Sequence, residues 1–169
     1  RDGALLAMER AMHRPPAGIL VAGLGGVGKT TLARGFVHWL VRTEGLGRGC
    51  FWFTFNEIRS AEFVINRMGE ALFGSDFIPA PREQKIERLV GAFREHRYLL
   101  VWDNFESARG IEGAPVGAML SAGDQELLKR FLQKLRGGKT KVILTSRIEE
   151  DWLGPPTALR STWEAWGRR

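Results

Sequence analysis

Residues 23–30 read Gly-Leu-Gly-Gly-Val-Gly-Lys-Thr and have the types and spacing needed to bind a phosphate chain. They fit the pattern G-x-x-x-x-G-K-[ST], in which glycines let backbone N–H groups approach phosphate oxygens without a clash at Cβ. Lys29 would supply a positive charge for the β- and γ-phosphates, and the Thr30 hydroxyl would coordinate Mg²⁺. We therefore predict a nucleoside triphosphate site, with ATP or ADP as ligand, formed by Gly23, Gly25, Gly26, Val27, Gly28, Lys29, Thr30 and Thr31.

A carboxylate that could hold the magnesium ion follows a later apolar run. Residues 98–102 read Tyr-Leu-Leu-Val-Trp, which indicates a buried strand, and Asp103 comes directly after it. Triphosphate-binding proteins of this kind place an acid for Mg²⁺ at the end of such a strand. We predict that Asp103 holds the ion together with Thr30. The plainer alternative is an aspartate that serves only as a turn residue.

Three further residues are candidates for the chemistry of hydrolysis. Asn104 follows Asp103 and could position a water molecule, although an amide cannot accept its proton. Glu106 could accept that proton; its alternative is a solvated loop carboxylate. Arg147 follows the fourth predicted strand, where it could reach the γ-phosphate, and its alternative is a surface arginine. Binding is therefore better supported by the sequence than turnover.

Alternating strands and helices must position these residues. The hydrophobic pattern predicts an α/β fold with a mostly parallel sheet covered by helices on both faces. Together with the phosphate-binding motif at 23–30, this indicates the three-layer sandwich of a P-loop NTPase. The sequence predicts loops at 74–82 and 104–123 and an N-cap at Ser60. The predicted strands lie at 19–22, 50–55, 98–102 and 141–145, and the predicted helices lie within 5–12, 32–41, 60–72, 86–93 and 124–136.

Composition limits the class of protein. The chain has 169 residues, a net charge of +6 and one cysteine, Cys50, so an internal disulfide is excluded. We interpret Cys50 as a small buried apolar residue, and we expect a cytoplasmic location and no membrane association. Lys and Arg are spread along the sequence with no block of five, so one phosphate pocket and solvated faces explain the charge more simply than nucleic acid does.

Three segments together resemble the STAND class of signal-transduction ATPases, which includes NB-ARC domains, and they are most similar to its bacterial regulators. The resemblance rests on Gly-Leu-Gly-Gly-Val-Gly-Lys-Thr-Thr at 23–31, Leu-Leu-Val-Trp-Asp-Asn-Phe-Glu at 99–106 and Val-Ile-Leu-Thr-Ser-Arg at 142–147. It implies a Walker A loop, a Walker B strand and a sensor arginine. It also implies an ATP/ADP switch that hydrolyses ATP slowly and self-associates in the full-length protein in response to nucleotide.

The resemblance also suggests where the family pattern ends. It covers 1–153, which we interpret as an incomplete NB-ARC-like core that lacks the last core strand and the nucleotide-contacting Gly-x-Pro motif. Arg1 and Asp2 would be the end of a motif near the adenine. We leave residues 154–169 unassigned, and a truncated gene product is one hypothesis for them.

Other functions remain open at this point. A scaffold that holds nucleotide without turnover fits Asn104, and a small-molecule kinase would need an acceptor site that the sequence does not indicate. A GTPase would need an Asn-Lys-x-Asp motif for its base, and the sequence has none.

Overall fold

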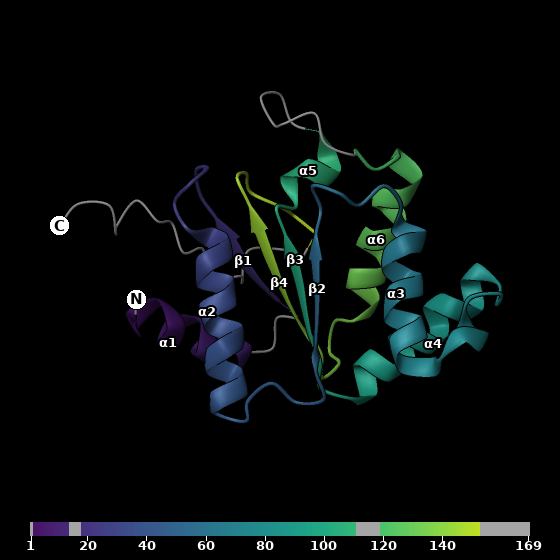
Figure 1. Cartoon of the computed structure of the whole chain (residues 1–169), viewed down its shortest axis with the longest axis horizontal. Helices are drawn as coiled ribbons and strands as arrows, with labels where there is room; N and C mark the ends of the chain where they lie inside the picture. Colours follow the sequence, from purple (N-terminus) through teal and green to yellow (C-terminus); the bar gives the residue numbers. More distant parts are fainter. Residues whose placement is uncertain (1, 14–17, 111–118, 153–169) are drawn as a thin grey trace.

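Four parallel strands form the centre of the computed structural model, which describes residues 2–13, 18–110 and 119–152 (Figure 1). Their order across the sheet is β1-β4-β3-β2, and all three pairings are parallel. The predicted α/β fold is confirmed. The strands are β1 (Gly18–Ala22), β2 (Cys50–Thr54), β3 (Leu99–Asp103) and β4 (Lys141–Ser146).

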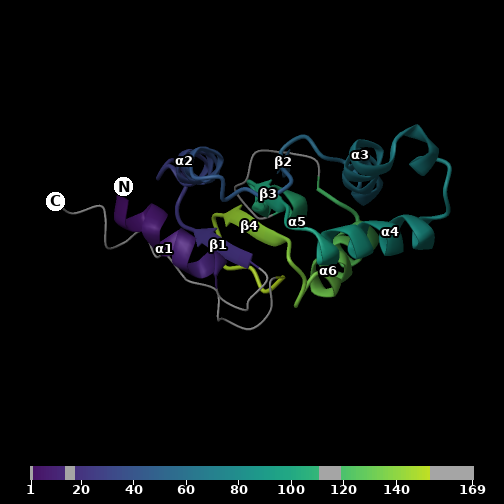
Figure 2. The ribbon, with the colours of Figure 1, turned by 90° about the horizontal axis from the view of Figure 1, so that it is seen from below.

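Helices cover both faces of the sheet, giving three layers (Figures 1 and 2). One face carries α1 and α2, and the other carries α3, α4 and α6. The helices are α1 (Asp2–Met12), α2 (Lys29–Arg42), α3 (Ala61–Phe73), α4 (Arg82–Glu95), α5 (Glu106–Arg109) and α6 (Ala122–Lys134), with a short 3₁₀ helix at Ser75–Phe77.

Side-chain alternation along the strands divides the core in two. In β3, Leu99 and Val101 pack toward α1 and α2, whereas Leu100 and Trp102 pack toward α3, α4 and α6. All four side chains are at most 1% exposed, as expected for a parallel strand covered on both faces. The strand that ends in Asp103 is therefore fixed from both sides.

Two predicted loops are wrong in part. The segment 104–123 contains α5 and the start of α6, and the segment 74–82 contains the 3₁₀ helix and the beginning of α4. A helix of three or four residues is too short to show periodicity, so only its tertiary contacts specify it. Ser60 is confirmed as the N-cap of α3, because its hydroxyl accepts the N–H of Phe63 over 3.2 Å.

Two smaller expectations also have an outcome. Cys50 lies at the start of β2 and is half-buried rather than fully buried; burial raises the pKa of its thiol to about 11. Within the described residues β1 is an edge strand with no fifth strand beside it. Residues 154–169 lie outside the described part of the chain, and the division at residue 153 stays a prediction.

Candidate functional site

The glycine-rich loop joins β1 to α2 at the carboxyl ends of the strands. Gly26 and Gly28 have φ angles of 78° and 89°, in the left-handed region that glycine adopts without a Cβ penalty. The N–H of Gly23 donates to the carbonyl oxygen of Ser146 over 3.1 Å, which ties the start of the loop to the end of β4. The loop thus turns sharply and presents the amino end of α2 to the site.

Lys29, the first residue of α2, lies inside this loop. Its ammonium donates to the carbonyl oxygens of Gly23 and Leu24 over 2.7 and 2.9 Å, and the residue is only 6% exposed. Burial lowers the pKa of Lys29, while the charge of Glu106 works in the opposite direction. The loop therefore holds a positive charge at its centre, in a partly desolvated setting where electrostatic attraction is strong.

Asp103 and Thr30 meet across the loop, as the sequence predicts. The Thr30 hydroxyl lies 2.8 Å from Oδ1 and 3.0 Å from Oδ2 of Asp103, which is 1% exposed. Oxygen atoms such as those of carboxylates and hydroxyls are the ligands that Mg²⁺ prefers. Their closeness shows that one ion could contact both side chains.

Thr145 is a member of the site that sequence reasoning missed. Its buried hydroxyl donates to Oδ1 of Asp103 and accepts the backbone N–H of Asn104 over 3.0 Å. The carboxylate thus receives hydrogen bonds from two threonines on different elements. A polar residue near the end of an otherwise apolar strand was the available signal in the sequence.

Asn104 lies where β3 turns toward α5. Its φ of 54° is in the left-handed region, which asparagine tolerates better than most residues. Its backbone is fixed from β4, because the N–H groups of Asn104 and Phe105 both donate to Thr145. The residue lines the same cavity as the glycine-rich loop.

Glu106 and Arg147 form an ion pair beside the loop. Oε1 of Glu106 lies 3.1 Å from Nε of Arg147, and Oε2 accepts the backbone N–H of Arg147 over 3.2 Å. Glu106 is 2% exposed, so the alternative of a solvated loop carboxylate is wrong. A Cβ placed on Gly25 would come within 3.3 Å of the Arg147 guanidinium, which therefore lies against the loop.

The other end of α5 is tied to the same segment of chain. Arg109 lies 2.9 Å from Oε2 of Glu150, and the Ser146 hydroxyl donates to Oε1 over 2.9 Å. Burial raises the pKa of Glu150, against the effect of its two hydrogen-bond partners. Both ends of α5 are thus attached to residues that follow β4, a link the sequence did not indicate.

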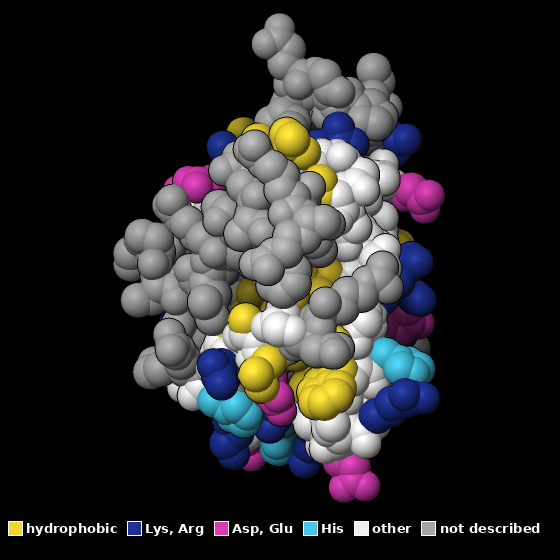
Figure 3. All heavy atoms as spheres, turned by 90° about the vertical axis from the view of Figure 1, so that its left-hand side faces the viewer, with side chains coloured by type: hydrophobic (Ala, Val, Ile, Leu, Met, Phe, Trp, Pro, Cys, Tyr) yellow, Lys and Arg dark blue, Asp and Glu magenta, His cyan; other side chains and the backbone are white. Residues whose placement is uncertain are grey.

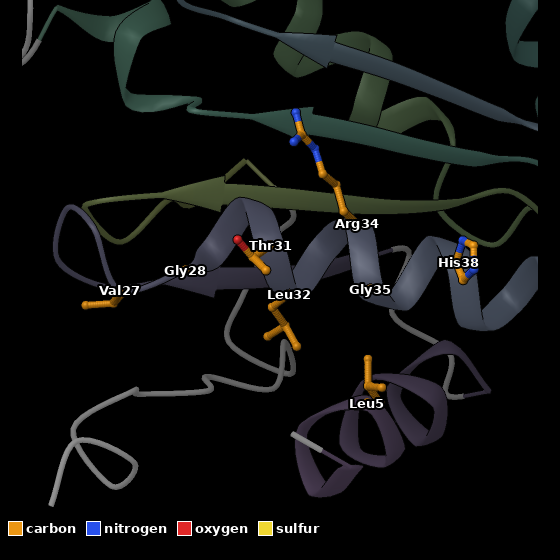
Figure 4. Close-up of a pocket in the computed structure, with 8 residues that line it drawn as sticks. All are labelled: Leu5, Val27, Gly28, Thr31, Leu32, Arg34, Gly35 and His38. Atoms are coloured by element: carbon orange, nitrogen blue, oxygen red, sulfur yellow. The ribbon is translucent and has the colours of Figure 1, made fainter.

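Two adjoining cavities lie along the start of α2. The smaller, of about 280 Å³, is lined by Gly25, Gly26, Gly28, Lys29, Thr30, Thr31, Asn104 and Arg147. The larger, of about 550 Å³, is lined by Leu5, Val27, Gly28, Thr31, Leu32, Arg34, Gly35 and His38 (Figure 4). Gly28 and Thr31 border both cavities, so a single elongated ligand could occupy the two together.

The larger cavity has an apolar side. In Figure 4, Leu5 of α1 and Leu32 of α2 point into the space between the two helices, whereas Arg34 points toward the sheet. The Arg34 guanidinium lies 5.8 Å from the ring centroid of Trp52 in β2, consistent with that direction. Val27 lines this cavity rather than the smaller one.

Neither a protein-only metal cage nor a membrane helix is found in the described ranges. No three His, Cys, Asp or Glu side chains there are grouped to hold an ion. No helix in those ranges is long and apolar enough to cross a bilayer. A divalent ion at Thr30 and Asp103 would therefore take most of its remaining ligands from water or from a phosphate chain.

Comparison with known proteins identifies the family to which this domain belongs. The family described as the NACHT domain matches residues 18–154, which is most of the chain. This match confirms the resemblance to P-loop NTPases of the STAND class. A search of the curated proteins found no match.

Solved structures share the fold at low sequence identity. The ORC1 protein of Aeropyrum pernix in complex with DNA is 19% identical, with a TM-score of 0.61 over 91% of this chain and 43% of that one. Drosophila ORC bound to DNA is 15% identical, with a TM-score of 0.62 over 95% of this chain and 40% of that one. Domain III of the Thermotoga maritima replication initiation protein DnaA is 19% identical, with a TM-score of 0.51 over 90% of this chain and 54% of that one. The chain thus spans about two fifths of the ORC chains and about half of the DnaA domain.

Proposed function

The chain belongs to the NACHT domain family of P-loop NTPases, and we propose that it is the ATP/ADP-binding switch domain of a STAND-type signalling ATPase. Nucleotide binding follows from the family; the preference for ATP, the need for magnesium and the signalling role are parts of the proposal. One observation carries it: Lys29, Thr30 and Arg147 line a single cavity, with Asp103 hydrogen-bonded to Thr30 at its edge.

The phosphate chain would occupy the smaller cavity. The loop N–H groups and the amino end of α2 favour negative charge there, and Lys29 adds a fixed cation. Binding would replace one or both of the hydrogen bonds that the ammonium now donates to Gly23 and Leu24. Those contacts keep Lys29 at the centre of the loop, ready to meet a phosphate.

The side-chain oxygens of Asp103 and Thr30 are suitable ligands for magnesium. Asp103 and Thr30 would hold it, and the ion would neutralise charge on the phosphates. Thr145 keeps the Asp103 carboxylate oriented toward Thr30 by donating to Oδ1. Two protein ligands are typical for Mg²⁺, which retains several waters and binds substrate phosphates.

The nucleoside would lie in the larger cavity. Its volume of about 550 Å³ is within the usual range for small-molecule sites, roughly 300 to 1,000 Å³. Leu5, Val27 and Leu32 offer apolar contact to an aromatic base, and the shared border at Gly28 gives continuity with the phosphate site. These side chains do not distinguish adenine from guanine, so base preference must be measured.

Arg147 would report the nucleotide state. Its guanidinium lies against the loop and is held by Glu106, so a γ-phosphate would compete with that carboxylate for the same cation. Glu106 is the first residue of α5, and Arg109, its last residue, is paired with Glu150. Breaking the Glu106–Arg147 pair would therefore release one end of α5 and alter the position of the other. The response would differ between ATP and ADP, as a switch requires.

Binding without turnover is the second candidate, and one observation favours it. Both oxygens of Glu106 are engaged with Arg147, which leaves that carboxylate poorly placed to accept a proton from water. Asn104, next to Asp103, cannot accept one. Phosphate release from Mg-ATP at a rate above the buffer blank would reject this candidate.

Calorimetric titration tests the main proposal. ATP, ADP and GTP are titrated into the full chain with and without Mg²⁺, and then into Arg147→Ala. We expect ATP to bind in a magnesium-dependent manner, and the substitution to lower the affinity for ATP more than the affinity for ADP. Equal losses of affinity for the two nucleotides would show that Arg147 is not part of the switch. Absence of binding by all three nucleotides would overturn the proposal.

A further inference from the structure

The end of the sheet opposite the nucleotide site carries a surplus of positive charge. Three segments lead into β2, β3 and β4 there, namely 42–49, 94–98 and 134–141, and we call them the basic pole. They contain two acids, Glu44 and Glu95, and eight cations: Arg42, Arg48, Arg94, Arg97, Lys134, Arg136, Lys139 and Lys141. Their surplus of six equals the net charge of +6 of the whole chain, so the remainder of the chain is balanced.

Backbone hydrogen bonds hold the three segments side by side. The N–H of Arg48 donates to the carbonyl of Arg97 over 2.8 Å, and that of Lys139 donates to the carbonyl of Arg94 over 3.0 Å. The segments enter neighbouring strands and meet at the lower end of the sheet in Figure 1. Figure 3 shows several Lys, Arg and His side chains at the lower end of the adjoining face, with Asp and Glu side chains among them.

Three exposed cations of the basic pole lack the carboxylate partners that many other cations of the described residues have. Within the described residues, Arg48, Arg97 and Lys139 form no ion pair, and all three are exposed. Elsewhere in the described part of the chain, six cations each lie within 4 Å of an acid: Arg67, Lys85, Arg109, Lys129, Arg130 and Arg147. The charges of these three side chains therefore remain available to an external anion.

Like charges at the pole are close enough to affect one another. Burial lowers the pKa of Lys141, and the positive charge of Arg97 lowers it further. Such repulsion costs folding free energy, which an anionic partner would recover on binding.

We propose that the basic pole binds the backbone of duplex nucleic acid without reading its sequence. Five of the eight cations are arginines, whose planar guanidinium groups suit phosphate oxygens. Adjacent strands are about 4.8 Å apart, so the three segments spread their charges over roughly 10 Å, comparable with the width of a groove. The pole faces away from the glycine-rich loop, so nucleotide and duplex could bind together.

The alternatives fit less well. Single-strand binding relies on exposed aromatic side chains, and Tyr98, the aromatic residue of the pole, is half-buried against Phe51 and Phe93. None of the large hydrophobic side chains that are exposed lies within the three segments, which disfavours insertion into a bilayer. Trp39 and Val41 are exposed on the last turn of α2, so anionic vesicles are the necessary comparison.

The test compares two triple variants of the full chain that remove the same charge. One is Arg48→Ala/Arg97→Ala/Lys139→Ala at the pole, and the other is Arg59→Ala/Arg67→Ala/Arg82→Ala away from it. Binding of a random-sequence DNA duplex of about 30 base pairs is followed by fluorescence anisotropy between about 50 and 200 mM KCl. Single-stranded DNA and vesicles with anionic lipid are the parallel probes, and circular dichroism establishes folding of each variant.

We expect the parent to bind the duplex with salt-dependent affinity and to prefer it to both parallel probes. The pole variant should lose at least about tenfold in affinity, with the slope of log K against log salt reduced by about 1 for each removed cation that contacts a phosphate. The other triple variant should stay close to the parent. Equal losses in the two variants, no binding by the parent, or a preference for vesicles or single strands would each overturn the proposal.

Discussion

Glu106 holds Arg147 at two points, the side-chain Nε at 3.1 Å and the backbone N–H at 3.2 Å. Glu106 is buried on α5 and Arg147 directly follows β4, so the contact joins two elements distant in sequence. The pair lies next to the glycine-rich loop, where Arg147 approaches Gly25. A charged partner that fixes the arginine is a simple way to set its distance from a phosphate.

The effects of Glu106→Gln and Arg147→Ala on ATP affinity should therefore not be additive. Once Arg147 is absent, removing the charge of Glu106 should have little further effect on ATP affinity, which gives a coupling free energy with a magnitude of roughly 0.5–3 kcal/mol in a double-mutant cycle. Calorimetry with Mg-ATP on the four proteins measures it. If Glu106 is instead the proton acceptor, Glu106→Gln will abolish phosphate release and leave ATP affinity unchanged.

Lys29→Ala should weaken ATP binding by about tenfold or more, because a buried cation that hydrogen-bonds phosphate is worth roughly 1.5–3 kcal/mol. Lys139→Ala is the matched control, since it removes an exposed lysine at the other end of the sheet. Calorimetric titration of both variants gives the comparison. Similar affinities in the two would contradict the assignment of the loop.

Asp103→Asn should abolish the effect of Mg²⁺ on ATP affinity. The amide oxygen can still accept from Thr30, so the site keeps its shape, but a neutral ligand holds a divalent ion far less well than a carboxylate. The measurement is ATP affinity with and without magnesium, in the parent and the variant. A magnesium effect of the parental size in Asp103→Asn would place the ion elsewhere.

Glu150→Gln should stabilise the protein increasingly as the pH rises from about 4 to 7. Burial raises the pKa of Glu150 above its ordinary value of 4.5, so the folded state binds the proton more tightly than the unfolded state. The stability from this group is therefore present below pH 4.5 and is lost as the pH rises through the folded-state pKa. Glutamine stays neutral throughout and avoids that loss.

Urea denaturation of parent and Glu150→Gln at several pH values checks this expectation. Glu57→Gln, which removes the charge of an exposed carboxylate, is the matched control. A stability difference for Glu150→Gln that shrinks with rising pH would show that the Arg109 contact outweighs burial.

Two helical glycines should respond in opposite directions to alanine. In α3, a Cβ on Gly69 would overlap the ring of Phe77, so Gly69→Ala should destabilise by roughly 1–3 kcal/mol through overpacking. In α4, Gly91 is exposed and has nothing within 4 Å of such a Cβ, so Gly91→Ala should stabilise by about 0.5–1 kcal/mol through helix propensity. Free energies of unfolding from urea titration measure the effect of each substitution. If both variants were stabilised, or both destabilised, relative to the parent, the packing argument would be refuted.

The sequence alone determined the local parts of this protein. Glycine spacing specified the phosphate loop, and the apolar runs located all four strands to within a residue or two. These features depend on neighbouring residues, through backbone conformation and the alternation of strands with helices. The predicted order of strand, loop and helix is the observed one, although the helix begins at Lys29, three residues before the predicted range.

Only the tertiary structure decided which distant residues meet. Because β3 and β4 are neighbours in the sheet, their carboxyl ends lie at one edge. This arrangement brings Thr145 to Asp103 and Arg147 to Glu106. The same folding gathers Arg48, Arg97 and Lys139 at the opposite edge, although Lys and Arg are dispersed along the sequence. Strand order depends on long-range packing and hydrogen bonding, which no local pattern of residues records.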